Sequence, residues 1–223
     1  MKSLSISSVV SCHICPIRFM LEQNNKRKDE HENYTMAKQI SYHLGDDIET
    51  EEIWDEIKTI NPVISNDAHE LYSAWINRLK TTVWPRASQN DVKVSSDKLG
   101  VHGVVDRYFD SAPYIALTRL SPAPETGIYN ADRVRSALFS ICANETLGIK
   151  AEEIILEYIP SATARICKIS PRDRREALSA LKTARKILSG YVPVKNKTMP
   201  CENCYLKDKC SKGPVKLSDL LKE

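Results

Sequence analysis

Leu99-Gly100-Val101-His102-Gly103-Val104-Val105-Asp106-Arg107-Tyr108-Phe109 decides the fold of this chain of 223 residues. Valines and aromatic residues are frequent in this stretch, a composition typical of β-strands. Residues 92–94 before it and residues 113–120 after it have the same character, so we expect neighbouring strands there. Further upstream, apolar residues recur at helical spacing instead. The hydrophobic period therefore changes here from that of helices to that of a sheet.

Helices are predicted on both sides of this centre. The expected positions are 13–23 around Cys15, 34–44, 48–60 and 67–84 upstream, and 131–146 and 171–190 downstream. Two more strands are expected at 154–159 and 164–169. Ser170 and Pro171 suit the N-cap and first position of the last helix. Its buried side is expected to hold Leu178, Leu181, Ile187 and Leu188. This order predicts an α/β fold in a single domain over 1–223. Its expected parts are a helical part over 1–90, an α/β core over 91–190, and a Cys-rich cap with a tail over 191–223.

Four cysteines near the two ends of the chain form a second pattern. Cys15 stands in Cys15-Pro16-Ile17-Arg18-Phe19, and Cys201, Cys204 and Cys210 follow one another closely near the other end. Several thiolates so close in sequence suit a soft metal ion or an iron–sulfur cluster. The spacing alone does not separate zinc from a 4Fe–4S cluster. A fourth ligand has to come from elsewhere in the chain.

Cys15 is our prediction for the fourth ligand, which would join the two ends of the chain at one metal centre. Cys12 and His13 are the alternatives for that position, and free thiols are the alternative for the whole set. Cys142 and Cys167 lie on apolar faces of expected elements, so we place them in the core. An intracellular protein keeps its thiols reduced. We therefore expect metal ligands rather than disulfides, and a cytoplasmic protein.

Charge is segregated along the chain, although the formal net charge is only +3. Residues 29–70 hold twelve Asp or Glu and two Lys, and residues 165–197 hold ten Lys or Arg and two acids. A basic stretch of this kind can bind phosphates, and a solvated helix face is the alternative. The candidates for nucleic-acid contact in it are Arg172, Arg174, Arg175, Lys182 and Arg185. No apolar run is long enough to cross a membrane, and the stretch at 3–11 lacks the apolar length of a signal peptide.

Asp106 ends an apolar strand and is followed by a second strand. This is one way to present a carboxylate to a metal ion, and a turn or edge position is the alternative. The features around it follow a recognisable order: Cys-Pro-x-Arg-Phe at Cys15, a helical histidine at 43, the Gly-x-Val-Asp strand, a second strand, a helix, a basic helix and Cys-x2-Cys-x5-Cys. In this order the chain resembles the RecB-like PD-(D/E)XK nucleases that carry an iron–sulfur cluster. It resembles most the CRISPR-associated exonucleases of the fourth Cas family.

This resemblance implies a restriction-endonuclease-like core, with a mixed central sheet flanked by helices. It implies a 4Fe–4S cluster on Cys15, Cys201, Cys204 and Cys210, and metal-site roles for His43 and Asp106. The family pattern then asks for Glu-x-Lys on the next strand, where this chain has Leu117-Thr118-Arg119. It asks for Gln-x3-Tyr on the following helix, where this chain runs from Arg135 to Phe139.

These departures predict weak or absent nuclease activity. Hard cations such as Mg²⁺ and Mn²⁺ prefer carboxylate ligands, and Leu117 removes one. Arginine keeps its proton at any relevant pH, so Arg119 does not replace a catalytic lysine. We expect Arg119 and Arg135 to hold a phosphate in place of the metal. The alternative is a pocket that has drifted and is filled by ion pairs.

The sequence thus favours an iron–sulfur protein of this nuclease family that binds DNA with little or no cleavage. Proteins of CRISPR adaptation, an antiviral defence, or of DNA repair are its expected partners. Two alternatives stay open. The first is an active metal-dependent exonuclease on single-stranded DNA with a rearranged site. The second is a non-enzymatic interaction module that uses the acidic helices over 46–80.

Overall fold

The protein, seen here as a computed structural model, is described over residues 3–24, 31–194, 201–202 and 204–210. Within these residues one mixed sheet of six strands forms the centre. Its strands are β1 (Leu4–Ser5), β2 (Gln89–Ser96), β3 (Val101–Tyr108), β4 (Ile115–Arg119), β5 (Glu153–Tyr158) and β6 (Thr163–Lys168). They lie in the order β1-β3-β4-β5-β6, with β2 paired to β3 off this path.

The sheet combines antiparallel and parallel pairs. β3 pairs antiparallel with β2 and β4, and β5 pairs antiparallel with β6. β4 and β5 are parallel, and helix α6 (Asn130–Leu147) makes the crossover between them, as parallel neighbours require. β1 adds a short parallel pairing to β3, so the beginning of the chain joins the sheet.

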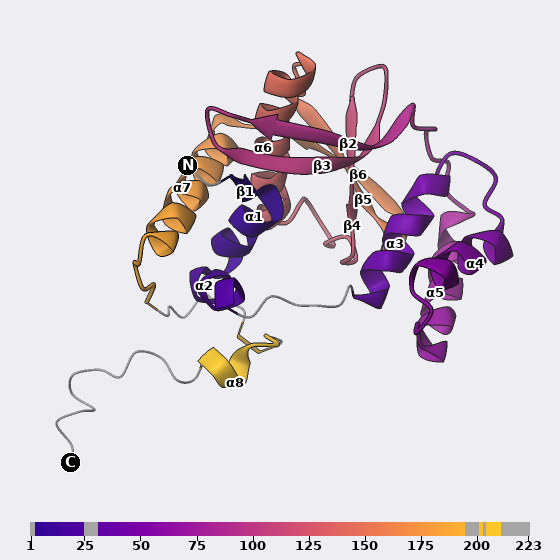
Figure 1. Ribbon diagram of the computed structural model, residues 1–223. Helices are drawn as coiled ribbons and strands as arrows, with labels where there is room; N and C mark the ends of the chain where they lie inside the picture. Colours follow the sequence, from indigo (N-terminus) through magenta and orange to yellow (C-terminus); the bar gives the residue numbers. More distant parts are fainter. Residues whose placement is uncertain (1–2, 25–30, 195–200, 203, 211–223) are drawn as a thin grey trace.

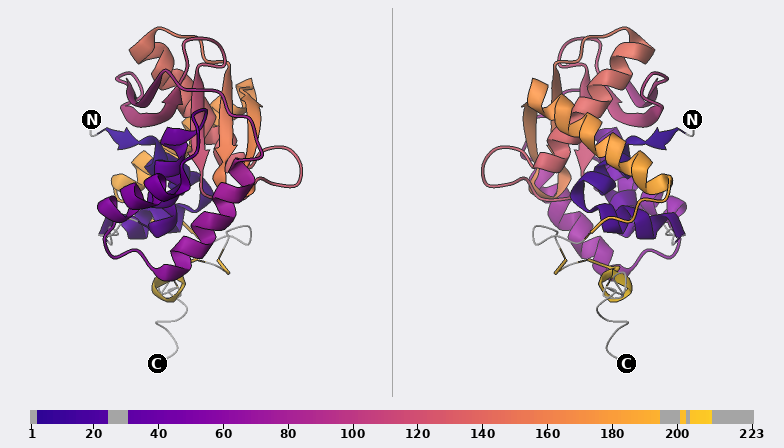
Figure 2. Two further views of the ribbon diagram at one scale, coloured as in Figure 1. Left: turned by 90° about the vertical axis from the view of Figure 1, so that its right-hand side faces the viewer. Right: turned by 90° about the vertical axis from the view of Figure 1, so that its left-hand side faces the viewer.

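Helices α1 (Ile6–Ile14), α6 and α7 (Pro171–Leu188) pack on one another beside the sheet, and α2 (Pro16–Asn24) contacts α1 and α7 (Figures 1 and 2). Valine, leucine and alanine side chains from these helices and the strands form the larger apolar core. Gly103 lets β3 approach the helices closely, because a Cβ there would lie 2.9 Å from atoms of Ile6 and Phe139.

A second apolar core lies in the helical lobe, residues 32–84, on the other side of the molecule (Figure 1). It consists of α3 (Glu32–His43), α4 (Thr50–Ile60) and α5 (Asn66–Leu79), which close around Trp54, Tyr72, Trp75 and Trp84. A 3-10 turn at Ile159–Ser161 packs against this lobe from the end of β5. The acidic residues of the first third lie largely on the outer faces of these helices, as expected.

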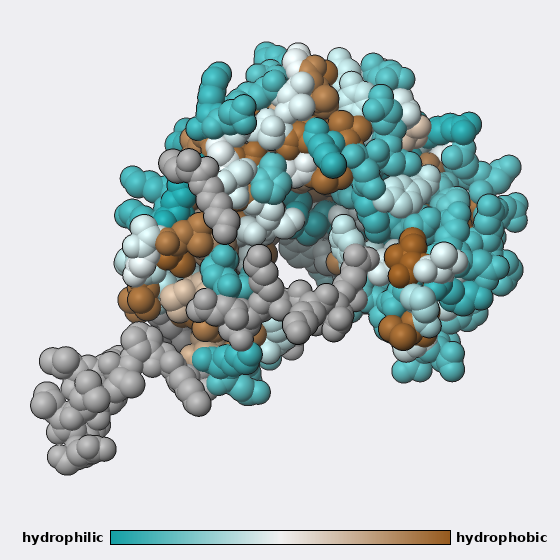
Figure 3. Space-filling view, in the orientation of Figure 1, coloured by the Kyte–Doolittle hydropathy of each residue, from teal (hydrophilic) through white to brown (hydrophobic). Residues whose placement is uncertain are grey.

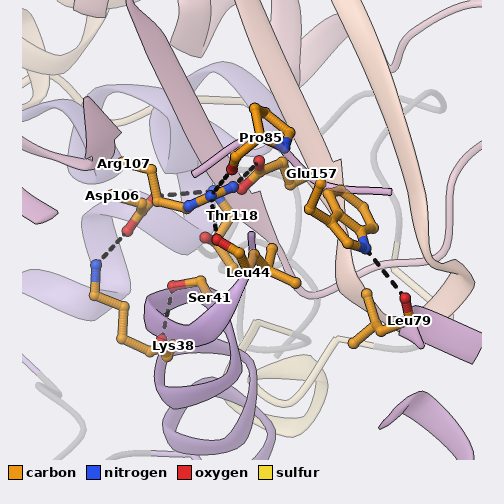
Figure 4. A network of polar contacts seen from close by, with 10 residues as sticks. Lys38, Ser41, Leu44, Leu79, Pro85, Asp106, Arg107, Thr118 and Glu157 are labelled. Carbon is orange, nitrogen blue, oxygen red and sulfur yellow. Dashed lines mark hydrogen bonds and ion pairs between the residues drawn. The ribbon is translucent and has the colours of Figure 1, made fainter. Parts of the chain in front are cut away.

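Arg107 fastens the helical lobe to the sheet (Figure 4). Its side chain is fully buried and pairs with the equally buried Glu157 of β5 at 2.5 Å. The same guanidinium donates to the backbone carbonyls of Leu44, at 2.6 Å, and Pro85. Burial raises the pKa of the Glu157 carboxyl, and the adjacent Arg107 charge opposes that shift. The neighbouring Asp106 is thereby held beside α3.

Two expectations about helices are corrected. The helix predicted over 13–23 is two helices, because the backbone at Cys15 is extended between α1 and α2. Leu178 and Leu188 are exposed, since α7 turns alanines toward α1 and α6 for close approach; its buried apolar residues are Ala177, Ala180, Leu181, Ala184 and Ile187. No helix in the described ranges is long and apolar enough to cross a membrane.

Candidate functional site

A cavity of about 670 Å³ opens where β3 and β4 meet the first turn of α1 and the N-terminal half of α6. The space-filling view shows a hollow in this face of the molecule, between α1 and α3 (Figure 3). Four residues singled out in the sequence line the cavity: Asp106, Leu117, Arg119 and Arg135. The remaining lining mixes polar and apolar residues: Ser5, Ile6, Ser7, Tyr34, His102, Gly103, Val104, Thr118, Leu120, Ser121 and Phe139.

The strand register brings Asp106 to the stretch that carries Leu117 and Arg119. Arg107 of β3 lies opposite Ala116 of β4, and the backbone N–H of Thr118 donates to Asp106 Oδ2 at 2.9 Å. Leu117 is 1% exposed and offers no oxygen to a cation. The position beside Asp106, where the resemblance implied a second carboxylate, is therefore apolar.

Lys38 of α3 occupies the other side of Asp106 (Figure 4). Its Nζ lies 2.6 Å from Asp106 Oδ1 and also contacts Asp91 Oδ1, while the hydroxyl of Tyr42 donates to Asp91 Oδ2. Burial alone would lower the pKa of Lys38, but Asp106 and Asp91 outweigh it, so the pKa is raised and the ammonium stays charged. Sequence reasoning missed both Lys38 and Asp91, whose roles depend on contacts between distant segments.

Arg119 and Arg135 meet at one buried carboxylate, that of Asp132. Arg119 Nε lies 2.7 Å and Arg135 Nε 4.0 Å from Asp132 Oδ1, and the hydroxyl of Tyr158 donates to Asp132 Oδ2 at 3.0 Å. Desolvation and then the nearby Arg119 charge lower the pKa of Arg135 to about 10. Two guanidinium groups thus share the buried carboxylate of Asp132 at the cavity wall.

His43 does not reach this cavity. Its Nε2 lies 2.7 Å from Glu56 Oε2, and Gln39 donates to the same oxygen. Burial opposes the shift, but hydrogen bonds from His43 and Gln39 lower the pKa of Glu56 overall. The metal-site role that the resemblance implied for His43 therefore has no support in its contacts, because they join α3 to α4 inside the helical lobe.

The basic side chains of α7 divide into two groups. Arg172, Arg175 and Lys182 are exposed, although Arg172 also pairs with Glu176 at 2.9 Å. Arg174 and Arg185 are half-buried, and Arg185 donates to the backbone carbonyl of Leu99. Exposed positions 172, 175 and 182 fall on one stripe at helical spacing. Lys195 and Lys197, at the end of the basic stretch, lie outside the described residues.

The cap that carries the C-terminal cysteines is docked on the helix that follows Cys15. Cys15 is buried, and its Sγ accepts the backbone N–H of Arg18 at 3.4 Å in the first turn of α2. The hydroxyl of Tyr205 donates to Glu22 of α2 at 2.6 Å. Leu206, just before α8 (Lys207–Cys210), is buried. In Figure 1, α8 lies below α2.

The four cysteines near the contact between the cap and α2, Cys15, Cys201, Cys204 and Cys210, have the chemistry of a four-thiolate centre. Cys201, Cys204 and Cys210 are partly exposed and form no disulfide, and Cys15 directly precedes the first turn of α2. No three His, Cys, Asp or Glu side chains of the described residues are gathered around one point. The centre would therefore require the thiols to converge when it forms.

The other sulfur and imidazole candidates have different surroundings. Cys12 is buried, and burial followed by the effect of Cys15 raises its pKa to about 12, which disfavours a thiolate. His13 Nε2 lies 3.2 Å from the side-chain nitrogen Nδ2 of Asn130. Cys142 and Cys167 are fully buried, which confirms the prediction that they belong to the core.

Comparison with known proteins finds the same architecture in a solved structure. No family model and no curated protein matches the sequence. A crystal structure of a "Putative exonuclease" from Eubacterium rectale is similar, with a TM-score of 0.58 and 14% sequence identity over 99% of this chain and 93% of that one. The likeness confirms the predicted fold class, an α/β fold with a mixed central sheet flanked by helices.

Proposed function

We propose that this chain is a DNA-binding protein built on a nuclease fold that holds the phosphate backbone without cleaving it. One observation carries the proposal. The same cavity is lined by Leu117, which offers no metal ligand, and by two arginines. Asp106 already has Lys38 as its cation, and Leu117 adds no second carboxylate. Arg119 and Arg135 line the same cavity.

A phosphate suits this cavity for electrostatic reasons. Arg119 and Arg135 present a double cation to a single buried carboxylate, Asp132. Guanidinium groups form strong, directional hydrogen bonds with phosphate oxygens. Burial and then the nearby Arg119 charge lower the pKa of Arg135, and an anion in the cavity would oppose both effects.

The exposed stripe of α7, at positions 172, 175 and 182, would add contacts to the DNA phosphate backbone that do not depend on the DNA sequence. Arg175 and Lys182 lie on this stripe, and such contacts contribute salt-dependent affinity. Arg174 and Arg185, which are partly committed to contacts within the fold, are weaker candidates. The resemblance to CRISPR-associated exonucleases supports DNA as the ligand, and adaptation or repair complexes as the setting.

We propose in addition that Cys15, Cys201, Cys204 and Cys210 bind a 4Fe–4S cluster with a structural role. The docking of Tyr205 on Glu22 supports this, because it brings the cap to the helix that begins next to Cys15. Such a cluster would tie the two ends of the chain together and requires reduced thiols, as found in the cytoplasm.

Fluorescence anisotropy with labelled single-stranded and duplex DNA, in EDTA, tests the first proposal. Arg119→Gln should weaken binding at least about 10-fold and reduce the slope of log K against log salt by about 1. Arg86→Gln is the matched control, because Arg86 is exposed and outside the cavity, where it pairs with Asp46. Equal affinity of wild type and Arg119→Gln would contradict a phosphate site in the cavity.

The same samples separate the alternatives. Intact DNA after incubation with Mn²⁺ is the expected result. Digestion that vanishes in Asp106→Ala would instead favour an active exonuclease. Tight binding to a protein partner without salt-sensitive DNA binding would favour the interaction module.

Iron analysis of an anaerobic preparation tests the cluster. About four irons per chain and a brown colour are expected, whereas one zinc in a colourless protein would contradict the assignment. Cys204→Ser should lose the iron and lower the thermal midpoint, while Cys167→Ser should retain the iron.

A further inference from the structure

Two carboxylates face each other across β2 and β3. One rung of this antiparallel pair joins Asn90 to Arg107. The next position on each strand is Asp91 and Asp106. Asp91 has a left-handed backbone with φ 56°, which aspartate tolerates better than most residues. Like charges at facing positions destabilise a ladder, so this point of the sheet requires a cation.

Lys38 supplies that cation from α3. Its Nζ contacts Oδ1 of both aspartates, at 2.6 Å for Asp106. The remaining two carboxylate oxygens accept hydrogen bonds from the backbone N–H of Thr118 and the hydroxyl of Tyr42. Each of the four oxygens therefore has a donor. The side chain of Lys38 is only 14% exposed, so the ammonium is held inside this cluster.

We propose that the Lys38 ammonium is a tethered substitute for the divalent cation that a nuclease-like site would hold at Asp106. The residues present do not fit such an ion, because Leu117 offers no ligand and Lys38 already fills the space between the carboxylates. The inference deepens the proposed function, and rests on it only for the role of the cavity. Because the Lys38 ammonium supplies a permanent positive charge, phosphate binding in the arginine-lined cavity beside Asp106 would not require added metal.

Removal of the ammonium provides the test. Two carboxylate oxygens that both contact one nitrogen can also approach one hard cation, which prefers such ligands. Lys38→Ala leaves Asp91 and Asp106 facing each other with no compensating charge. This variant should therefore acquire a divalent cation that the wild type does not bind.

Mn²⁺ binding, followed by equilibrium dialysis and by thermal unfolding in EDTA and in Mn²⁺, is the readout. Lys38→Ala should unfold at a lower temperature than wild type in EDTA and recover by roughly 5 °C in saturating Mn²⁺. Wild type should show no such shift. The double variants Lys38→Ala/Asp106→Asn and Lys38→Ala/Asp91→Asn should lose the recovery. Lys93→Ala, which removes an exposed lysine of β2, should behave like wild type.

The proposal is overturned if wild type binds Mn²⁺ as Lys38→Ala does, or if folded Lys38→Ala gains neither Mn²⁺ binding nor stability. Lys38→Met keeps most of the side-chain length without the charge and should give the same gain. If both variants are unfolded in EDTA, recovery of folded protein on addition of Mn²⁺ supports the proposal, and no recovery overturns it. DNA is absent from these measurements, so their outcome is separate from that of the DNA-binding assay.

Discussion

Asp132→Asn removes the single counter-charge that Arg119 and Arg135 share. Asp132 is 1% exposed, and its Oδ1 lies 2.7 Å from Arg119 Nε. Two unit charges about 4 Å apart interact by about 4 kcal/mol at an effective dielectric constant of about 20. The side chains of Arg119 and Arg135 are 20% and 17% exposed, so solvent screening reduces the expected loss to about 2–3 kcal/mol.

For a chain of this size a loss of about 2–3 kcal/mol corresponds to a fall in thermal midpoint of roughly 4–12 °C. Differential scanning calorimetry at low ionic strength measures it. Sulfate should restore part of the loss in Asp132→Asn, because an anion can replace the missing carboxylate between the arginines. Chloride at the same ionic strength should restore less.

A matched control uses an ion pair at the surface. Glu153→Gln removes a partner of Lys168, which is 83% exposed, so its cost should stay below about 1 kcal/mol. Adding Arg119→Met to Asp132→Asn should recover stability by removing one of the two repelling charges. The reasoning is refuted if Asp132→Asn costs no more than Glu153→Gln, or if sulfate and chloride act equally.

Other changes have equally definite outcomes. Gly45→Ala should lower the urea midpoint strongly, because φ is +94° and the new Cβ would lie 2.6 Å from the carbonyl oxygen of Pro85. Gly148→Ala, with φ +68° and open space around it, should cost only about 1 kcal/mol; equal midpoints for the two variants would contradict this account. Tyr205→Phe should loosen the cap from α2, measured as faster hydrogen exchange and proteolysis within 201–210, whereas Lys207→Ala should not. Unchanged protection in Tyr205→Phe would exclude this hydrogen bond as the anchor of the cap.

The strands and the longer helices were predictable because their signals are local. Ser170 caps α7 with a complete capping box, and Gly148 ends α6 in the left-handed conformation, both as the residue types indicate. The helix α1 was missed because serines interrupt its apolar pattern. β1 has only two residues and exists through its pairing with β3.

The site was predictable only in part. Asp106, Leu117, Arg119 and Arg135 do line one cavity, since strand order and register follow from the predicted fold. Lys38 could not be found in this way, because its partner Asp106 is 68 residues away and nothing in the sequence around α3 marks it. Asp132 could not be found either, because an acidic residue in the first turn of a helix is usually explained by its favourable interaction with the helix dipole.

The pairing of Leu4 with Val101 has a consequence for synthesis on the ribosome. β1 emerges long before its partner strand, and α1 later packs against α7. At roughly 5–20 residues per second, α1 would wait roughly 10–30 s for that helix. The helical lobe has its own apolar core, nearly all of it within residues 36–84, and can condense during this interval. Helix α1, which leaves the exit tunnel before the helical lobe, is thus among the last of these elements to find its packing partner, and nascent-chain chaperones would meet it unpacked.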